Sequence, residues 1–172
     1  MEDKITCNYS IFNTSFGLCG IALSENGVVK FILPGMAKDE IVSAISHEQL
    51  AAKNKKNKAV EDSIKRYFDG ERVDFNFPLD LSCMTDFQKK AYEITRTIPY
   101  GEVRTYKWVA KKIGLPDASR AVGGALSRNP IPLLIPCHRV AREDGGMGGF
   151  TAHGGIGLKI KMIELESKSL KV

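Results

Sequence analysis

The first third of the chain alternates between apolar and polar positions in a way that predicts β-strands. Between Tyr9 and Leu33, apolar side chains recur on both sides of a turn at residues 25–27, Glu-Asn-Gly. Alternation is typical of a strand with one buried face, and a turn between two such runs predicts a hairpin. We therefore expect two or three strands of a small antiparallel sheet.

Two helices are expected after this sheet. Apolar residues recur at helical intervals, first at Ile41, Val42, Ile45 and Leu50, and then at Val60, Ile64, Tyr67 and Phe68, with Gly70 as a stop signal. The lysine-rich tract 53–58 between them predicts a solvated loop, and contact with nucleic acid is the alternative. This order of elements indicates an α/β lobe.

A change of pattern near residue 84 indicates a domain boundary. The alternating segment VDFNF (73–77) predicts a last strand, and the mixed residues from Pro78 to Met84 resemble a connector. We therefore expect an N-terminal α/β lobe over residues 1–84 and a second lobe over residues 85–172.

Helical patterns dominate the second lobe. Thr85 and Gln88 have the spacing of a capping box before a first helix, a second helix is expected to stop at Gly114, and a third to begin near Asp117. Two short helices separated by a tight turn are typical of a helix-turn-helix motif. The small residues of ASRAVGGALSR would let the third helix approach a sugar-phosphate backbone. A glycine-rich loop, 145–157, precedes a last helix that starts near Ile156.

The composition indicates a globular cytoplasmic protein. Of the 172 residues, 43% are hydrophobic and 26% are charged, so the chain can bury a core. No apolar run approaches the roughly 20 residues of a membrane span, and the first residues lack the apolar core of a signal peptide. The net charge of +5 is compatible with a polyanionic partner but is common among proteins that have none.

Four cysteines are scattered singly, at Cys7, Cys19, Cys83 and Cys137. Because none has CxxC spacing, we expect neither a disulfide framework nor a zinc site, and no cofactor. Cys137 differs in its setting, IPLLIPCHRV, where His138 follows it directly. A thiol is nucleophilic only as thiolate, and an ordinary pKa of about 8.5 leaves a few per cent ionised at neutral pH, so a base must take its proton.

His138 is the candidate base. Adjacent side chains of an extended segment point in opposite directions, so the imidazole needs either a tight turn or a bridging water to reach the thiol. It also needs a carboxylate that fixes its tautomer, and spacing does not indicate which one. The alternative is a buried, inert Cys137 beside a merely hydrogen-bonded histidine.

The segment RAVGGALSRNPIPLLIPCHRV (120–140) closely resembles the signature of the O6-alkylguanine-DNA alkyltransferases. The flanking segments IPYGEVRTYKWVA and GGFTAHGGIGLKIKMIELE extend the resemblance over about residues 85–166, whereas the first lobe is similar only in the order of its elements. The resemblance implies a ribonuclease H-like N-terminal lobe, with a small antiparallel sheet and helices, and a mostly helical C-terminal lobe with a helix-turn-helix.

The implied activity is DNA repair by a single-turnover methyltransferase. An alkyl group would pass irreversibly from O6 of guanine, and from O4 of thymine, in duplex DNA onto Cys137 after base flipping. His138 would activate the thiol through a water, Glu166 would hold the histidine, and Tyr106 would donate a proton toward the departing guanine. Asn129 would brace the cysteine-bearing turn. The alternatives are an apolar helix face for Tyr106 and an ordinary turn initiator for Asn129.

The resemblance also implies a monomer whose small-residue helix binds the minor groove of double-stranded DNA. Arg120 would enter the duplex where the flipped nucleotide was, with phosphate binding as the alternative. The other residues expected to face DNA are Ser119, Ala121, Gly124 and Arg128. The residues expected to line the substrate pocket are Val140, Phe150 and Thr151.

The chain departs from the family pattern at two places. The loop GGFTAHGGIG is longer than the family's loop and lacks its tyrosine, which concerns pocket size and substrate range. Cys7 and Cys19 have only His47 in their lobe, so the Cys-Cys-His-His zinc set of some relatives is missing. Two alternative functions are a DNA-binding regulator or damage sensor without alkyl transfer, and a cysteine hydrolase, which would need an oxyanion hole.

Overall fold

The chain folds into two units, Met1–Asp80 and Leu81–Val172. The computed structural model describes residues 5–46, 50–54 and 57–169. Within these ranges no helix is both long and apolar enough to cross a membrane. The boundary expected near residue 84 stays a prediction.

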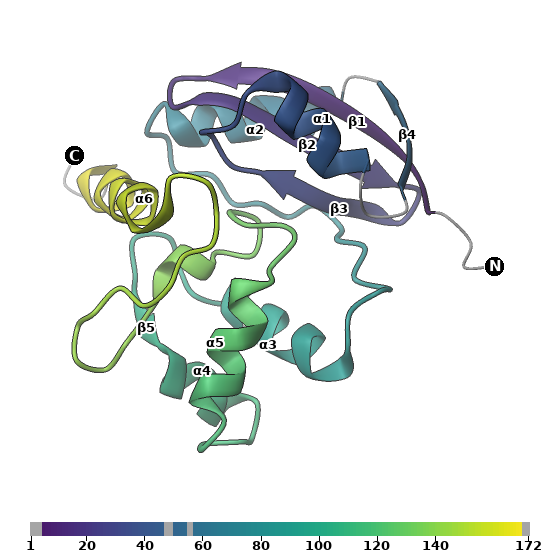
Figure 1. Ribbon diagram of the computed structural model, residues 1–172. Helices are drawn as coiled ribbons and strands as arrows, with labels where there is room; N and C mark the ends of the chain where they lie inside the picture. The colour runs from purple at the N-terminus through teal and green to yellow at the C-terminus, as the bar shows by residue number, and fades with distance from the viewer. Residues whose placement is uncertain (1–4, 47–49, 55–56, 170–172) are drawn as a thin grey trace. The chain divides into compact units, whose positions relative to one another are not determined.

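A four-stranded sheet forms the centre of the first unit (Figure 1). The predicted antiparallel strands are β1 (Ile5–Thr14), β2 (Gly17–Ser24) and β3 (Gly27–Ile32). Strand β4 (Leu50–Asn54) pairs parallel to β1 and completes the order β3-β2-β1-β4. The small antiparallel sheet predicted from the sequence is thus extended by one parallel edge strand.

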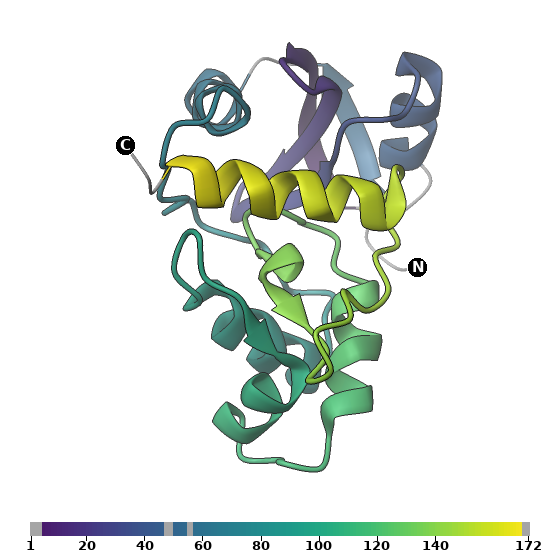
Figure 2. The same cartoon turned by 90° about the vertical axis from the view of Figure 1, so that its left-hand side faces the viewer.

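Two helices cover opposite sides of this sheet, α1 (Lys38–Ser46) and α2 (Lys58–Phe68) (Figures 1 and 2). The α1 side holds a buried cluster that includes Cys7 of β1 and Ile41 of the helix. On the α2 side, the Lys65 ammonium lies 5.6 Å from the centroid of the Phe12 ring. Alternate side chains of β1 therefore supply both halves of the core, as the period of a strand requires.

Three predictions for this unit are wrong. Leu50 was assigned to a helix and Lys53 to a loop, but both belong to β4, while residues 47–49 and 55–56 lie outside the described residues. The segment LAAKN has little β-propensity of its own, so its pairing with β1 decides its conformation. VDFNF alternates as a strand does but forms none, and the segment packs on α2 instead: the rings of Phe75 and Tyr67 lie 5.8 Å apart.

The second unit begins with the predicted capping box. Thr85 accepts a hydrogen bond from the Gln88 amide (3.2 Å), and α3 (Asp86–Arg96) follows. The predicted helix-turn-helix consists of α4 (Tyr106–Lys112) and α5 (Ser119–Ser127), with Gly114 in the connection at a φ of +82°. Glycine adopts this backbone conformation without steric cost.

Three short or unforeseen elements position the cysteine. They are β5 (Arg104–Thr105), β6 (Val140–Ala141), which pairs parallel to β5, and the 3-10 turn η1 (Cys137–Arg139). The last helix, α6 (Gly155–Ser169), packs against η1. In this helix Ile160 is 38% exposed, whereas Lys159 and Glu166 are buried. Apolar residues occur on several sides of α6, so periodicity alone cannot identify its buried face.

Candidate functional site

The cysteine lies in a tight turn rather than in an extended segment. Cys137 opens η1, its amide donates to the Ile135 carbonyl (2.7 Å), and the Arg139 amide donates to the Pro136 carbonyl (2.9 Å). Cys137 is 7% exposed and His138 is fully buried. A tight turn was one of the two arrangements expected to bring neighbouring thiol and imidazole groups toward each other.

Asn129 bonds to the backbone at both sides of the loop that leads into this turn. Its side-chain amide donates to the Ile135 carbonyl (2.9 Å), and its side-chain oxygen accepts from the Ile131 amide (3.0 Å). Between these points Leu133 has a φ of +73°, a conformation that costs energy for a residue other than glycine. Asn129 therefore holds a strained loop whose end carries the cysteine.

A buried carboxylate orients the imidazole. Glu166 of α6 is 1% exposed, and its Oε1 lies 2.7 Å from Nε2 of His138. Its Oε2 accepts from Nε of Arg139 (2.9 Å) and from the Gly101 amide (2.9 Å). Because a carboxylate only accepts, this pair places the ring proton on Nε2, so Nδ1 carries the lone pair that can take a proton.

Burial and hydrogen bonding compete in setting these protonation states. Burial acts to raise the pKa of Glu166, but its bonds to His138 and Arg139 outweigh burial and lower that pKa to about 2. Burial lowers the pKa of His138, against the opposing effect of Glu166. The imidazole is therefore neutral at neutral pH and can act as a base.

The thiol itself has opposing neighbours. Burial raises the pKa of Cys137, while a hydrogen bond with the Asn129 side chain and the positive charge of Lys159 act to lower it. Removing the thiol proton thus requires these local partners to offset the cost of a buried charge. The ionisation of Cys137 therefore depends on Asn129 and Lys159, which both favour the thiolate against the effect of burial.

A cavity of about 970 Å³ opens beside this site, between the helix-turn-helix and the glycine-rich loop. Tyr106, Ser119 and Arg120 line it, as do Gly148 and Met147 of the loop. The Tyr106 phenol is near enough to Cys137 for the thiolate charge to affect it: burial, and then Cys137, raise the pKa of Tyr106. The described residues that line this cavity do not include Cys137 itself.

The predicted DNA-facing residues share one side of α5. Arg120, Ala121 and Arg128 are exposed, and Gly124 and Ser119 are half-buried. The opposite side of the helix is buried and holds it to the unit through Val122, Ala125 and Leu126. In addition, the Tyr92 hydroxyl of α3 donates to the Ala125 carbonyl (2.9 Å). Packing and this hydrogen bond on the buried side of α5 therefore fix the position of the exposed face that carries Arg120.

The three predicted pocket residues are not gathered in the cavity. Val140 is fully buried, and its carbonyl accepts a hydrogen bond from Nζ of Lys159 (2.6 Å). Phe150 is half-buried, whereas Thr151 is exposed and its hydroxyl donates to the Ser127 carbonyl at the end of α5 (2.6 Å). Thr151 thus attaches the glycine-rich loop to α5.

Sequence reasoning missed three residues of this site. Arg139 stands in the quoted P-C-H-R motif but was given no role, although it donates to Glu166 and, from Nη1, to the Ile98 carbonyl (2.8 Å). Gly148 was treated only as loop composition, yet a Cβ there would lie 2.5 Å from the Tyr106 hydroxyl oxygen. Lys159 is a fully buried cation. The pattern of apolar neighbours does not distinguish Lys159 from the exposed Lys161, whereas Arg139 stands in the segment that resembles the family signature.

Over the described ranges, no group of three or more His, Cys, Asp and Glu side chains is placed to hold a metal ion. His47, the one histidine noted with Cys7 and Cys19, lies outside the described residues. The expectation of no metal and no cofactor stays a prediction.

Both halves of the chain match known families. Residues 86–168 match the model for the DNA binding domain of 6-O-methylguanine DNA methyltransferase, and residues 7–81 match the model for its ribonuclease-like domain. The chain is 39% identical over 154 residues to the methylated-DNA--protein-cysteine methyltransferase of Methanothermobacter thermautotrophicus, an alignment that covers 88% of this chain and 81% of that relative. It is 34% identical to the protein of the same name from Sulfolobus acidocaldarius, over 95% of each chain.

Solved structures give the same result. The crystal structure of Mycobacterium tuberculosis OGT in complex with DNA matches 94% of each chain with a TM-score of 0.78 and 32% identity. The O6-methylguanine-DNA methyltransferase from Pyrococcus kodakaraensis matches 92% of this chain and 98% of that chain, with a TM-score of 0.72 and 26% identity. The predicted fold class, including the ribonuclease-like N-terminal part, is confirmed.

Proposed function

This chain belongs to the 6-O-methylguanine DNA methyltransferase family, and from that premise we propose that it repairs DNA by moving an alkyl group from O6 of guanine onto Sγ of Cys137. The observation that carries the proposal is the Cys137 turn, in which the neighbouring imidazole bonds a buried carboxylate at 2.7 Å. This arrangement supplies a thiol, a base and an orienting acid within a DNA-binding domain.

The proposed reaction is a displacement at saturated carbon. His138 accepts the thiol proton at Nδ1, directly or through a water, while Glu166 stabilises the imidazolium. Sγ of Cys137 then forms a bond to the alkyl carbon as the carbon–O6 bond breaks, and the electron pair of that bond moves to O6. Overall, one proton passes from the thiol to the guanine, which stays in the DNA as an unmodified, neutral base.

Tyr106 is the proposed donor of the proton to the guanine, and the proton that His138 took from the thiol then replaces the one lost by the phenol. Its phenol lines the cavity, and negative charge develops on O6 only as the reaction proceeds, so a hydroxyl directed there stabilises the transition state more than the bound substrate. Asn129 keeps the cysteine-bearing turn in place through its two backbone bonds. The product is a thioether without an electrophilic carbonyl, so each molecule acts once.

Damage inside a base stack is reached by flipping the nucleotide out, at a cost of a few kcal/mol. We assign to Arg120 the place that the flipped base leaves, because Arg120 is exposed on α5 and lines the cavity. Ser119, Ala121, Gly124 and Arg128 would contact the DNA around it. Repair must be independent of sequence, which favours the minor groove, where base pairs are poorly distinguished.

The remaining assignments follow from the same family membership. Val140, Phe150 and Thr151 would border the bound base, and O4-alkylthymine would be a second substrate. The protein would act as a monomer in the cytoplasm. Phe150 and Thr151 follow Met147 and Gly148, which line the cavity, in the glycine-rich loop. The conformation of this loop therefore sets how near the two side chains lie to a base in the cavity.

Intact-protein mass spectrometry after incubation with duplex DNA containing one O6-methylguanine tests the proposal. We expect a gain of one methyl group, at most one per molecule, that peptide mapping assigns to Cys137. Cys137→Ser should show no gain. Cys83→Ser, which removes the exposed cysteine, is the matched control and should react like the wild type.

Two outcomes would contradict alkyl transfer. Tight binding of the methylated duplex without any gain in mass would indicate a damage sensor. Turnover of an ester or a peptide by Cys137 would indicate a hydrolase, since that activity regenerates the thiol.

A further inference from the structure

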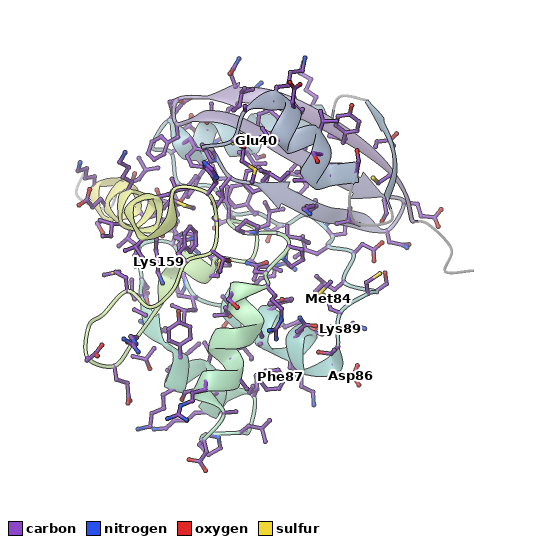
Figure 3. All side chains as sticks on the ribbon, in the orientation of Figure 1. Glu40, Met84, Asp86, Phe87, Lys89 and Lys159 are labelled. Atoms are coloured by element: carbon purple, nitrogen blue, oxygen red, sulfur yellow. The ribbon has the colours of Figure 1, made fainter. Side chains whose placement is uncertain are left out.

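The buried face of α6 carries a cation as well as the carboxylate of Glu166. Lys159 is fully buried, and its Nζ donates to the Val140 carbonyl (2.6 Å) and to the Met147 carbonyl. Figure 3 shows the Lys159 side chain extending from α6. Burying an ammonium group is costly unless it is well bonded, so an apolar residue would be the ordinary choice at this position.

Through these two carbonyls Lys159 links a segment fixed by strand pairing to a glycine-rich loop. Val140 directly follows the Cys137–Arg139 turn, in a strand that is fixed by pairing with β5, whereas Met147 belongs to the glycine-rich loop that lines the cavity. In the described part of that loop, Gly145 and Gly148 have φ values of +81° and +67°. A chain of this kind has few intrinsic restraints, so one strong bond to its backbone restricts it considerably.

The same ammonium lies within electrostatic reach of the acceptor sulfur. Lys159 acts to lower the pKa of Cys137, and Cys137 in turn acts to raise the pKa of Lys159 against the effect of burial. The coupling is reciprocal, as it must be for two charges that stabilise each other. Lys159 is thus tied by hydrogen bonds to the peptide group next to the cysteine turn and by charge to the thiolate.

We infer that Lys159 is a positioning residue of the acceptor site, which fixes the glycine-rich loop beside the Cys137 turn and places a buried positive charge next to that turn. The inference rests on the proposed function, because it gives this site a second supporting residue on α6. Glu166 would act through His138 on one side of the cysteine, and Lys159 would act through Val140 on the other.

Other titratable groups act on the thiol or on its candidate base. The charge of Cys137 raises the pKa of Tyr92 in α3 and of Tyr106 in α4, and Glu166, Arg139 and Lys159 affect the pKa of His138. Lys159 is the cation whose charge acts to lower the pKa of the thiol. Its replacement by methionine removes the charge and the hydrogen bonds but keeps the apolar stem.

The test measures the pH profile of Cys137 alkylation by iodoacetamide, with peptide mapping to separate the four cysteines. In Lys159→Met we expect the midpoint of the profile to rise by about 0.5–1 pH unit and the rate at neutral pH to fall about 3- to 10-fold. Lys159→Arg should recover most of the rate. Lys161→Met, an exposed lysine of the same helix, should match the wild type, and Cys83 in each sample is an internal reference.

Hydrogen exchange tests the second half of the inference. Amides of residues 145–154 should exchange faster in Lys159→Met than in Lys161→Met. An unchanged alkylation midpoint in folded Lys159→Met would overturn the electrostatic role, and unchanged exchange would overturn the role in holding the loop.

If Lys159→Met does not fold, the wild-type protein decides the question. Capping Cys137 with iodoacetamide removes its negative charge, so the ammonium pKa of Lys159, followed by NMR, should fall; no change would overturn the inference. None of these measurements needs DNA. The role of Lys159 can therefore fail while methyl transfer from DNA is observed, and the proposed repair function can fail while Lys159 behaves as expected.

Discussion

Glu166 accepts hydrogen bonds from His138, Arg139 and Gly101 although it is 1% exposed. Its pKa falls from an ordinary 4.5 to about 2, because these bonds outweigh the effect of burial. A carboxyl whose pKa is lower in the folded state than in the unfolded state stabilises the fold at pH values above its unfolded-state pKa. This stability is lost as the pH falls through the folded-state pKa. The shift corresponds to about 3 kcal/mol at neutral pH.

We therefore predict that Glu166→Gln lowers the free energy of unfolding at neutral pH by about 3 kcal/mol, because the Arg139 guanidinium stays buried without its counter-ion. Between about pH 4.5 and pH 2 the wild type should lose stability more steeply than this variant, because the carboxyl of Glu166 has these two pKa values in the unfolded and folded states. Urea denaturation at several pH values measures both effects. Glu164→Gln, on the exposed side of α6, is the control, and equal losses in the two variants would contradict the prediction.

Gly148 sets the position of the Tyr106 hydroxyl. Its φ is +67°, and a Cβ would lie 2.5 Å from the hydroxyl oxygen and 3.0 Å from Cε2. Gly148→Ala must therefore move the phenol or the loop, and we expect methyl transfer to slow by about 10- to 100-fold, since a displacement of about 1 Å can cost that much. Gly149→Ala should leave the rate unchanged, because no atom lies within 4 Å of the added methyl group. Single-turnover kinetics on the methylated duplex compare the two.

At the scale of elements, the segment from Asn129 to Cys137 combines the two side-chain bonds of Asn129 with short-range backbone bonds, such as that from the Ile135 amide to the Ile131 carbonyl (2.9 Å). Asn129→Ala should lower the free energy of unfolding by about 1–3 kcal/mol and should slow alkylation of Cys137, because the thiol loses a hydrogen bond that lowers its pKa. Thr85→Ala removes the α3 cap at a cost of about 1 kcal/mol. It should leave the Cys137 rate unaltered, so a parallel slowing in both variants would attribute the effect to general destabilisation.

Elements with a strong local signal could be predicted from the sequence, and elements that depend on a distant partner could not. The capping box at Thr85 and the stop at Gly114 are read from neighbouring residues, and both are confirmed. Strand β4, by contrast, exists through its pairing with β1, and VDFNF has the alternation of a strand but does not form one. The hydrophobic pattern predicts which side chains of a segment face the core, but it does not predict with which other strand the segment pairs.

The candidate site divides in the same way. Cys137 and His138 are adjacent in the sequence, and the turn that holds them was among the arrangements foreseen. Glu166 was named through the family resemblance alone, because it lies 28 positions after His138 and such a separation does not predict that two residues are in contact. The bonds of Lys159 to two carbonyls could not be foreseen, since backbone carbonyls carry no sequence signature.

At the scale of the whole molecule, the proposed reaction leaves a permanent change in a packed turn. Cys137 is 7% exposed, its neighbours Pro136 and His138 are buried, and a methyl thioether has neither a proton to donate nor a charge for Lys159 to stabilise. An added methyl group in a packed interior costs about 1–3 kcal/mol.

We therefore expect the methylated protein to melt several degrees below the unmodified protein, at about 2–4 °C per kcal/mol for a chain of this size. Calorimetry on protein freed from DNA after reaction measures the difference, and protein incubated with undamaged duplex is the control. Hydrogen exchange should locate the loss in residues 129–141 and in α6, whose Glu166 and Lys159 both bond to this region. An equal or higher melting temperature would show that the turn accommodates the methyl group, and the reacted protein would then persist as a stable product.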